Sequence, residues 1–241
     1  MTPPLFLLDS LPDGETIVLD GDEGRHAARV MRVRVGETVL AGDGRGSVLE
    51  GTVVAIRPGG LELAISVRRT ESPADPRVVV VQALPKGGRG ELAVELLTEL
   101  GVDEIVPWRA ARCVTVWSAA RADRAVAKWR RTVREAAKQS RRAWVPTVSE
   151  PADTEGVAAR LADASASLVL HEQATSRLGD FTPPTTGELI LIVGPEGGIT
   201  DGELARLRGA TPVRLGQHVL RTSTAGAAAL AALALRLGRW N

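Results

Sequence analysis

The sequence is poor in the residues that cross-link chains or bind metals. Its 241 residues include a single cysteine, Cys113, and only three histidines, His26, His171 and His218. One cysteine cannot form an internal disulfide, so a protein of the reducing cytoplasm is expected. These four side chains lie too far apart in sequence to match the ligand spacing of a zinc site. The sequence therefore predicts no metal centre.

Long apolar runs and a strong net charge are also missing. No run approaches the roughly 20 apolar residues that cross a bilayer, which predicts no membrane partner. The first residues lack the basic and apolar segments of a signal peptide, so none is expected. The net charge of +1 neither favours nor opposes a nucleic-acid partner. Hydrophobic residues make up 44% of the chain, which is ordinary for a globular protein with a real core.

The positive charge is concentrated in two segments. Residues 121–142 hold nine Arg or Lys against two acids, and residues 25–34 hold four Arg and no acid. One such cluster is most simply a solvated helix face. Two clusters in separate segments favour a bound polyanion such as a nucleic acid.

The pattern of apolar and turn-forming residues changes along the chain. Residues 15–69 are short apolar runs separated by Gly/Asp turns, with one short helix at about 23–31, which predicts a small β-barrel or sandwich. The later part alternates between strands and helices, which predicts a mostly parallel sheet covered on both faces. The expected division is a β domain at 1–70, a proline-containing linker at 71–77 and an α/β domain at 78–241.

Apolar periodicity and capping residues place the elements of the α/β domain. Strands are expected at 78–84, 104–108, 166–172, 188–194 and 212–216, and helices at 90–101, 121–142, 153–164, 200–209 and 224–237. Gly101 is expected to end the first helix, and Thr200 with Glu203 is expected to form a capping box. The expected buried stripe of the first helix consists of Leu92, Leu96, Leu97 and Leu100.

A glycine-rich loop, GPEGG at 194–198, follows a buried strand and precedes a helix. Its three glycines allow the backbone to approach a ligand and expose N–H groups. The loop could hold phosphate, form a cofactor-adenosine pocket, or be a tight turn. It matches neither a dinucleotide-binding nor a Walker A pattern, so the loop alone leaves the function open.

The last expected helix, 224–237, is apolar nearly all round, which predicts that it is buried or lies in an oligomer interface. Arg221 stands just before it in an otherwise uncharged run. An unpaired charge at the end of a buried helix is costly, so Arg221 is expected to have an anionic partner from the protein or a substrate.

Basic and aromatic residues stand together elsewhere in the second domain. Lys86 and Arg89 follow the first strand of the α/β domain, at the end where such sheets bind ligands. Trp129 and Trp144 flank basic residues and could stack on bases, although core packing is the commoner role of tryptophan.

Five segments in the same order resemble the RsmE-type 16S rRNA (uracil-N3)-methyltransferases of the SPOUT superfamily: RHAARVMRVRVGE, KGGRGELAVELLTELGVDEIVPW, KWRRTVREAAKQSRR, LIVGPEGGIT and LGQHVLRTSTA. The resemblance covers nearly the whole chain. It implies an N-terminal PUA-like β-barrel that binds RNA and a C-terminal SPOUT α/β domain with a trefoil knot. It also implies a homodimer that binds S-adenosylmethionine (SAM) in the knot. General topological rules alone would make such a knot very improbable.

The resemblance implies a SAM pocket built from the loops after three C-terminal strands. Its expected residues are Leu170, His171, Glu172, Gly194, Pro195, Glu196, Gly197, Gly198, Leu215, Gly216, Val219, Leu220, Arg221, Thr222 and Ala225. The basic segments and the strand end supply the expected RNA contacts, namely Arg25, His26, Arg29, Arg32, Arg34, Lys86, Arg89, Arg131, Arg134 and Arg141.

The implied reaction is methylation of uracil N3 in the 16S rRNA of the small ribosomal subunit. N3 must lose a proton, and the resulting negative charge must be stabilised beside the methyl donor. Arg221 is the expected stabilising cation and Glu196 the expected proton acceptor, although Glu196 could instead cap the helix near residue 200. Two alternatives are a 2′-O-ribose methyltransferase of the same superfamily and a non-catalytic ribosome-assembly factor.

The sequence departs from the usual family pattern at Ser223, Leu96 and Ile199. Family members more often have Glu, Lys and Phe there, respectively. These changes leave the expected cofactor pocket intact. They exclude a catalytic acid at position 223.

Overall fold

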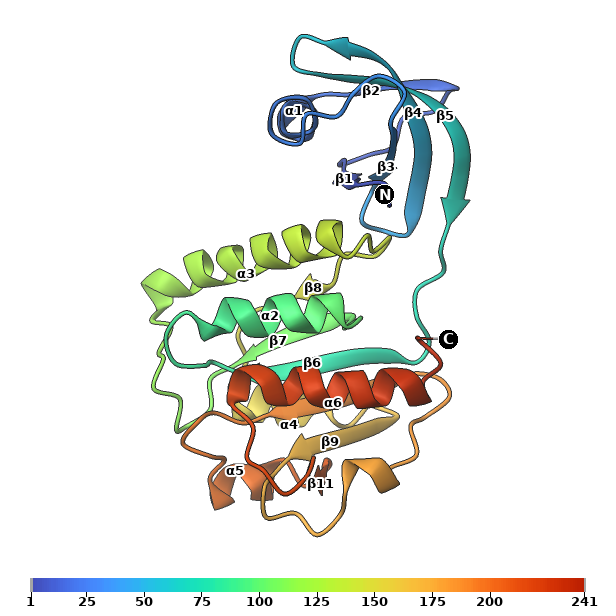
Figure 1. Cartoon of the computed structure of the whole chain (residues 1–241). Coiled ribbons are helices and arrows are strands. Elements are labelled where there is room, and N and C mark those ends of the chain that lie inside the picture. The colour runs from blue at the N-terminus through green and yellow to red at the C-terminus, as the bar shows by residue number, and fades with distance from the viewer. Residues whose placement is uncertain (1, 241) are drawn as a thin grey trace. The chain divides into compact units, whose positions relative to one another are not determined.

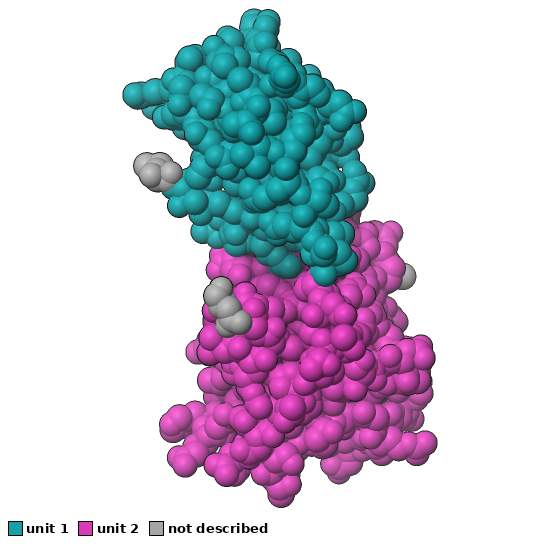
Figure 2. Space-filling model, turned by 90° about the vertical axis from the view of Figure 1, so that its right-hand side faces the viewer, with its two compact units in different colours: residues 1–73, 137–145 teal, residues 74–136, 146–241 magenta. Residues whose placement is uncertain are grey.

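The computed structural model describes residues 2–240, and the chain divides into two compact units (Figure 2). Unit 1 consists of residues 1–73 and 137–145, and unit 2 of residues 74–136 and 146–241. No helix among the described residues is long and apolar enough to span a membrane.

Unit 1 is built on a five-stranded sheet with the strand order β1-β3-β4-β5-β2. The strands are β1 (Leu5–Leu7), β2 (Thr16–Leu19), β3 (Thr38–Gly42), β4 (Ser47–Arg57) and β5 (Gly60–Thr70), and β1 pairs with β3 in the parallel sense. A short helix α1 (Gly21–Arg25) continues into a π-helical turn η1 (His26–Val30). The alternating pattern of β2 buries Ile17 and Leu19, so one face of the sheet covers an apolar core, as the sequence predicts.

Unit 2 is built on a six-stranded parallel sheet with the strand order β11-β9-β10-β6-β7-β8 (Figure 1). The strands are β6 (Arg77–Ala83), β7 (Glu104–Trp108), β8 (Thr147–Val148), β9 (Ala166–Leu170), β10 (Glu188–Val193) and β11 (Thr211–Val213). Both faces of β6 are buried, as its continuous run of valines predicts.

Helices cover both faces of this sheet. They are α2 (Arg89–Glu99), α3 (Ala119–Gln139), α4 (Thr154–Arg160), α5 (Asp201–Arg206) and α6 (Thr222–Arg236), with a short 3-10 turn η2 at Leu178–Asp180. Helices α2 and α6 pack together on one face, and α4 and α5 lie together on the other (Figure 1). Each helix and parallel strand predicted from the sequence is present within a few residues of its expected bounds.

The buried face of α2 coincides only in part with the predicted leucine stripe, since Leu97 is buried and Leu96 and Leu100 are partly buried. The helix buries Gly90, Ala93, Val94, Leu97 and Thr98, whereas the side chain of Leu92 is 43% exposed. A Cβ added at Gly90 would lie 3.1 Å from the Trp129 indole, so close helix contact favours the side with small residues. The predicted end of the helix is confirmed: Gly101 has φ +96° and Val102 N–H donates to Leu97 O.

Residues 137–145 belong to unit 1, although the sequence-based division placed them in the second domain. Ala143 is buried with Leu5 and Leu40, and Trp144 and Val145 pack against this cluster. The Trp144 indole N–H donates to Glu71 O at 2.9 Å. Helical periodicity identifies an apolar side chain but not the domain whose core it enters.

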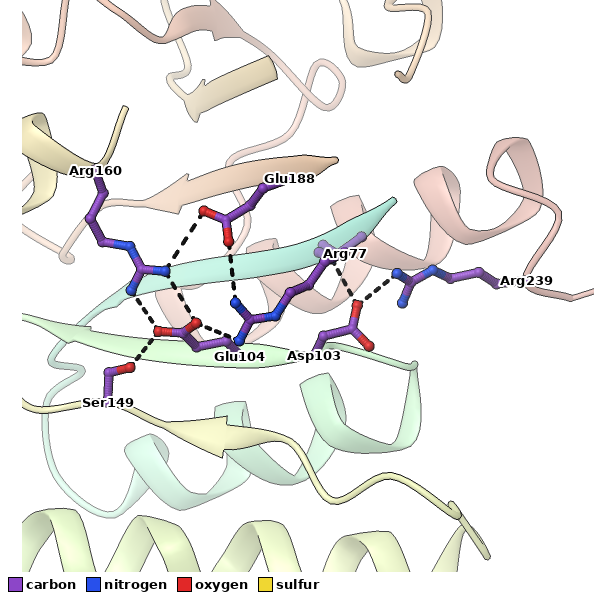
Figure 3. Close-up of polar contacts among 8 residues, drawn as sticks. Arg77, Asp103, Glu104, Ser149, Arg160, Glu188 and Arg239 are labelled. Atoms are coloured by element: carbon purple, nitrogen blue, oxygen red, sulfur yellow. Dashed lines mark hydrogen bonds and ion pairs between the residues drawn. The ribbon is translucent and has the colours of Figure 1, made fainter. Parts of the chain in front are cut away.

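A buried carboxylate joins three strands at the amino-terminal edge of the parallel sheet (Figure 3). Glu104 is 5% exposed and binds Arg160 at 2.5 Å and Arg77 at 2.6 Å, and Ser149 donates a further hydrogen bond. Arg77 also pairs with Glu188, the first residue of β10. Burial alone would raise the pKa of Glu104. The hydrogen bonds from Arg160 and Ser149 and the nearby positive charges outweigh burial and hold that pKa below its ordinary value.

Glu104→Gln should lower the free energy of unfolding at pH 7 by about 3–5 kcal/mol, because two arginines lose their shared buried partner. Because the folded-state pKa of Glu104 is depressed, its contribution is present above the unfolded pKa and is lost as the pH falls through the folded pKa. Urea denaturation from pH 7 to pH 3 measures both effects. Glu150→Gln, which removes an exposed partner of Arg130, is the control and should cost less than about 1 kcal/mol. Equal costs for the two variants would contradict this account of the network.

Candidate functional site

The carboxyl ends of neighbouring parallel strands bring the predicted loops to one edge of the unit 2 sheet. Val193 at the end of β10 and Val213 at the end of β11 are both in register with Leu170 at the end of β9. His171 N–H donates to Val213 O at 3.0 Å. The loops that begin at Leu170, Gly194 and Arg214 therefore start side by side, at the position where α/β sheets bind ligands.

The glycine loop 194–198 is a tight turn with specific packing needs. Gly198 has φ +76° and its N–H donates to Pro195 O at 2.9 Å. A Cβ at Gly194 would lie 2.7 Å from Cγ1 of Ile199, whose side chain is buried in the core. Ile199 thus fills the space beneath the loop in place of the phenylalanine expected from the family pattern.

The exposed carboxylate of Glu196 faces the end of β6. Its Oε1 accepts a hydrogen bond from Lys86 N–H at 3.1 Å. Two residues expected at the site, one from each loop, are therefore in contact.

The alternative role of Glu196 as a helix cap is filled by other residues. The predicted capping box of α5 is confirmed, because Thr200 Oγ1 accepts from Glu203 N–H and Glu203 accepts from Thr200 N–H. Glu203 also accepts from Ala111 N–H at 2.8 Å and from Thr154. Burial acts to raise the pKa of Glu203, but the hydrogen bonds from Ala111 and Thr200 outweigh it and lower that pKa.

Arg112 is a residue of this edge that the sequence-based reasoning missed. Its Nη1 donates to Gly197 O at 3.2 Å, and a Cβ at Gly197 would lie 2.9 Å from Arg112 Cβ. Thr115 Oγ1 anchors the same segment by donating to Pro85 O at 2.7 Å. The segment follows β7, so the strand-end rule that selected Lys86 and Arg89 could also have selected Arg112.

Arg221 is exposed, which corrects the expectation of a charge at a buried helix end. It is the N-cap residue of α6, and its carbonyl accepts from Thr224 Oγ1 at 3.1 Å. Within residues 2–240 its guanidinium forms no ion pair. Its neighbours Val219 and Leu220 are also exposed, so water solvates the charge and no protein anion is needed.

The segment after β11 runs beside the connection between β9 and β10. Arg214 N–H donates to Ser176 O at 2.9 Å, and Leu178 N–H donates to Arg214 O at 3.0 Å. The carbonyl of Thr222, the first residue of α6, lies 3.4 Å from Gln82 Nε2, so the start of α6 is beside the end of β6.

Of the two candidate stacking tryptophans, Trp129 is buried and Trp144 is partly buried. Trp129 is 2% exposed and meets the Trp117 ring edge-on, with ring centroids 5.1 Å apart. Trp144 forms part of the unit 1 packing described above. The commoner role, core packing, therefore applies to Trp129, and Trp144 packs against the edge of a core cluster.

The expected RNA-contact residues differ in how free their side chains are. Arg25 pairs with Asp22, and the His26 ring is half-buried against Phe6. Arg141 donates to Pro3 O and Thr2 O. The side chains that stay exposed are those of Arg25, Arg29, Arg32, Arg34, Lys86, Arg89, Arg131 and Arg141, whereas Arg134 is partly buried.

Comparison with known proteins decides the family. Residues 71–234 match the model of an RNA methyltransferase domain, and residues 19–66 match that of an RNA methyltransferase PUA domain. The chain belongs to this RNA methyltransferase family. It is 49% identical over 248 residues to ribosomal RNA small subunit methyltransferase E of Mycobacterium tuberculosis, a match that covers 100% of this chain and 95% of that protein. The Bacillus subtilis protein of the same name is 28% identical over 92% of this chain and 91% of its own length.

Solved structures show the same fold. The methyltransferase E of Neisseria gonorrhoeae, bound to S-adenosylmethionine, matches with a TM-score of 0.84 and 29% identity, over 97% of this chain and 98% of that one. A Legionella pneumophila methyltransferase in complex with SAM matches with a TM-score of 0.81 and 27% identity, over 97% and 96% of the two chains. The predicted fold class, a PUA-like domain followed by a SPOUT-type α/β domain, is confirmed.

Gly197→Ala should lower the free energy of unfolding by about 1–3 kcal/mol, because the added methyl group overlaps Arg112. Gly216→Ala is the matched control: apart from its two chain neighbours, no described residue has an atom within 4 Å of the added Cβ, and the φ of Gly216 is ordinary. It should be neutral or stabilise by up to about 1 kcal/mol. Chemical denaturation of both variants measures the difference. A neutral Gly197→Ala would show that Arg112 does not constrain the glycine loop.

Proposed function

We propose that this protein transfers a methyl group from SAM to N3 of a uracil in the 16S rRNA of the small ribosomal subunit. The observation that carries the proposal is the 49% identity, over the whole chain, to a ribosomal RNA small subunit methyltransferase E. The five segments that resemble the uracil-N3 methyltransferases support the choice of atom. The single cysteine and the ribosomal substrate favour a cytoplasmic site of action.

The carboxyl edge of unit 2 fits the cofactor. Gly198 turns the backbone there, and the open space around Gly216 leaves room beside the exposed side chains of Val219 and Leu220. Backbone groups of the loops at 170–172, 194–198 and 215–222 would hold the adenosine moiety, and apolar side chains would pack on the adenine. SAM supplies the electrophilic methyl group.

The chain's own residues prepare the uracil for reaction. Glu196, held by a hydrogen bond from Lys86 N–H, accepts the N3 proton. The N3 lone pair then forms a bond to the methyl carbon of SAM as the bond between that carbon and the SAM sulfur breaks, and the bonding electrons stay on sulfur. The negative charge on the uracil oxygens is stabilised by Arg221, an exposed cation with no competing ion pair among the described residues. Positioning of the two reactants supplies much of the remaining rate enhancement.

Incubation of the protein with labelled SAM and purified small ribosomal subunits, followed by nucleoside analysis, tests the function. The expected product is 3-methyluridine. Recovery of 2′-O-methyluridine would overturn base methylation in favour of ribose methylation. Absence of any methylated nucleoside would favour an assembly factor.

Gly216→Val provides the cofactor arm of the same experiment. A Cβ at Gly216 meets no atom within 4 Å apart from its chain neighbours, but bound SAM would compete with the valine side chain for this space, so SAM affinity should fall about tenfold or more, or about 1.4 kcal/mol. Gly179→Val, at another glycine with open space, is the control and should bind SAM normally. Unchanged affinity of Gly216→Val would place the cofactor elsewhere.

We also propose that the protein is a homodimer that uses the outer face of α6. Ala228 and Ala232 are exposed on this helix, and the Leu235 side chain is 62% exposed, so the face turned away from the sheet is apolar. A second copy of the same helix would cover this face from water.

Ala228→Asp should convert the dimer to a monomer, because a charge would be buried in the interface. Light scattering at micromolar concentration measures the change. Ala159→Asp, at an exposed alanine of α4, is the control and should remain dimeric. A wild-type protein with the mass of one chain would refute this interface.

A further inference from the structure

Two helical segments end at an arginine in the left-handed conformation. Arg141, after α3, has φ 56°, and Arg32, after η1, has φ 54°; no other non-glycine residue in the described chain has positive φ. Glycine is favoured at such a position because it has no Cβ to clash with the backbone. An arginine at such a position is expected where interactions of its side chain offset the conformational cost of the left-handed backbone.

The side chain of Arg141 makes such interactions within the fold. Its Nε donates to Pro3 O at 2.8 Å and its Nη2 donates to Thr2 O. The side chain therefore holds the start of the chain against the end of α3. The conformational cost of the left-handed arginine is offset by these two hydrogen bonds.

The side chain of Arg32 makes no such offsetting interaction among the described residues. The backbone closes the helical turn around it, with Met31 N–H donating to His26 O and Val33 N–H donating to Ala27 O. Its exposed guanidinium forms neither a hydrogen bond nor an ion pair within residues 2–240. Glycine would serve the fold better at this position, so the role of the arginine side chain lies outside the folded chain.

The residues around Arg32 combine positive charge with exposed apolar surface. Val30 is 72% exposed, Met31 49% and Val35 58%, although all three are apolar. The guanidinium groups of Arg29 and Arg34 form no ion pair among the described residues. Glu37, the nearby acid, accepts a hydrogen bond from the backbone N–H of Arg34.

This combination matches the chemistry of an unpaired RNA strand. Such a strand presents phosphates and the flat apolar faces of its bases, whereas an RNA duplex stacks those faces inside and presents mainly phosphate and sugar. Positive charge alone would be enough to bind the phosphates of a duplex. A duplex would leave the exposed apolar side chains of Val30 and Met31 uncovered.

We propose that the turn at residues 29–35 binds an unpaired RNA strand, with Arg32 on a backbone phosphate and Val30 and Met31 against the face of a base. The inference rests on the proposed function, since it concerns how the rRNA substrate is held. It assigns separate tasks to the charged and apolar residues of one turn.

Titrations with a fluorescent single-stranded RNA oligonucleotide, and with the duplex of the same sequence, separate these tasks. Arg32→Gly should raise the urea midpoint of unfolding while it weakens RNA binding, and the slope of log affinity against log salt should shrink by about 0.7 for one lost phosphate contact. Met31→Ser should weaken binding of the single strand about fivefold or more with an unchanged salt slope, and should leave duplex binding unchanged.

Two variants of unit 1 serve as controls. Arg57→Gln removes the same charge from an arginine that is paired with Glu62, and Val54→Ser removes an apolar side chain that is 47% exposed. Both should bind the single strand within about twofold of wild type.

The outcomes separate this inference from the function on which it rests. If Arg32→Gly is stabilised and its affinity and salt slope are unchanged, the turn does not bind RNA. If Met31→Ser lowers the affinity for the single strand and for the duplex equally, the turn does not contact the faces of unpaired bases. A wild-type protein that methylates small subunits while both results are negative would refute the inference alone, whereas one that methylates nothing would refute the proposed function.

Discussion

The common direction of six strands is the constraint on which unit 2 depends. Because every strand of the sheet is parallel, all their amino ends lie at one edge and all their carboxyl ends at the other. The two edges have different chemistry. Arg77, Glu104 and Glu188 begin their strands, and the partly exposed Arg77 pairs with both the buried Glu104 and the partly buried Glu188, whereas the carboxyl ends lead into glycine-rich and exposed loops.

This separation lets the protein combine rigidity with an open site. The ion pairs at the amino edge fix the starts of β6, β7 and β10, so their far ends are also fixed in register. At the carboxyl edge, Glu203 acts as a second buried carboxylate, which joins α5 to the segment after β7. Neither acid is proposed to react. Their lowered pKa values show that hydrogen bonds to the charged form outweigh burial, as expected for structural carboxylates.

In unit 1, an unfavourable backbone conformation that the fold does not offset indicates a functional residue. The left-handed conformation at Arg141 is offset by hydrogen bonds to the chain, and that at Arg32 is not. The valines and the methionine beside Arg32 likewise leave about half or more of their surface exposed. The same short turn therefore contains both kinds of residue that an RNA ligand would satisfy.

The sequence alone determined the features that are encoded within a few neighbouring residues. The valine run of β6, the Gly101 helix end and the Thr200–Glu203 capping box were all predictable, because each depends on backbone geometry and partners at most a few positions away. The ordered segments also predicted the family. Only the tertiary structure decided which side of α2 is buried, that residues 137–145 enter the core of unit 1, and that Arg221 is exposed. It also revealed the contact of Arg112 with Gly197, 85 positions along the chain. These features depend on which distant side chains meet, and local periodicity does not contain that information.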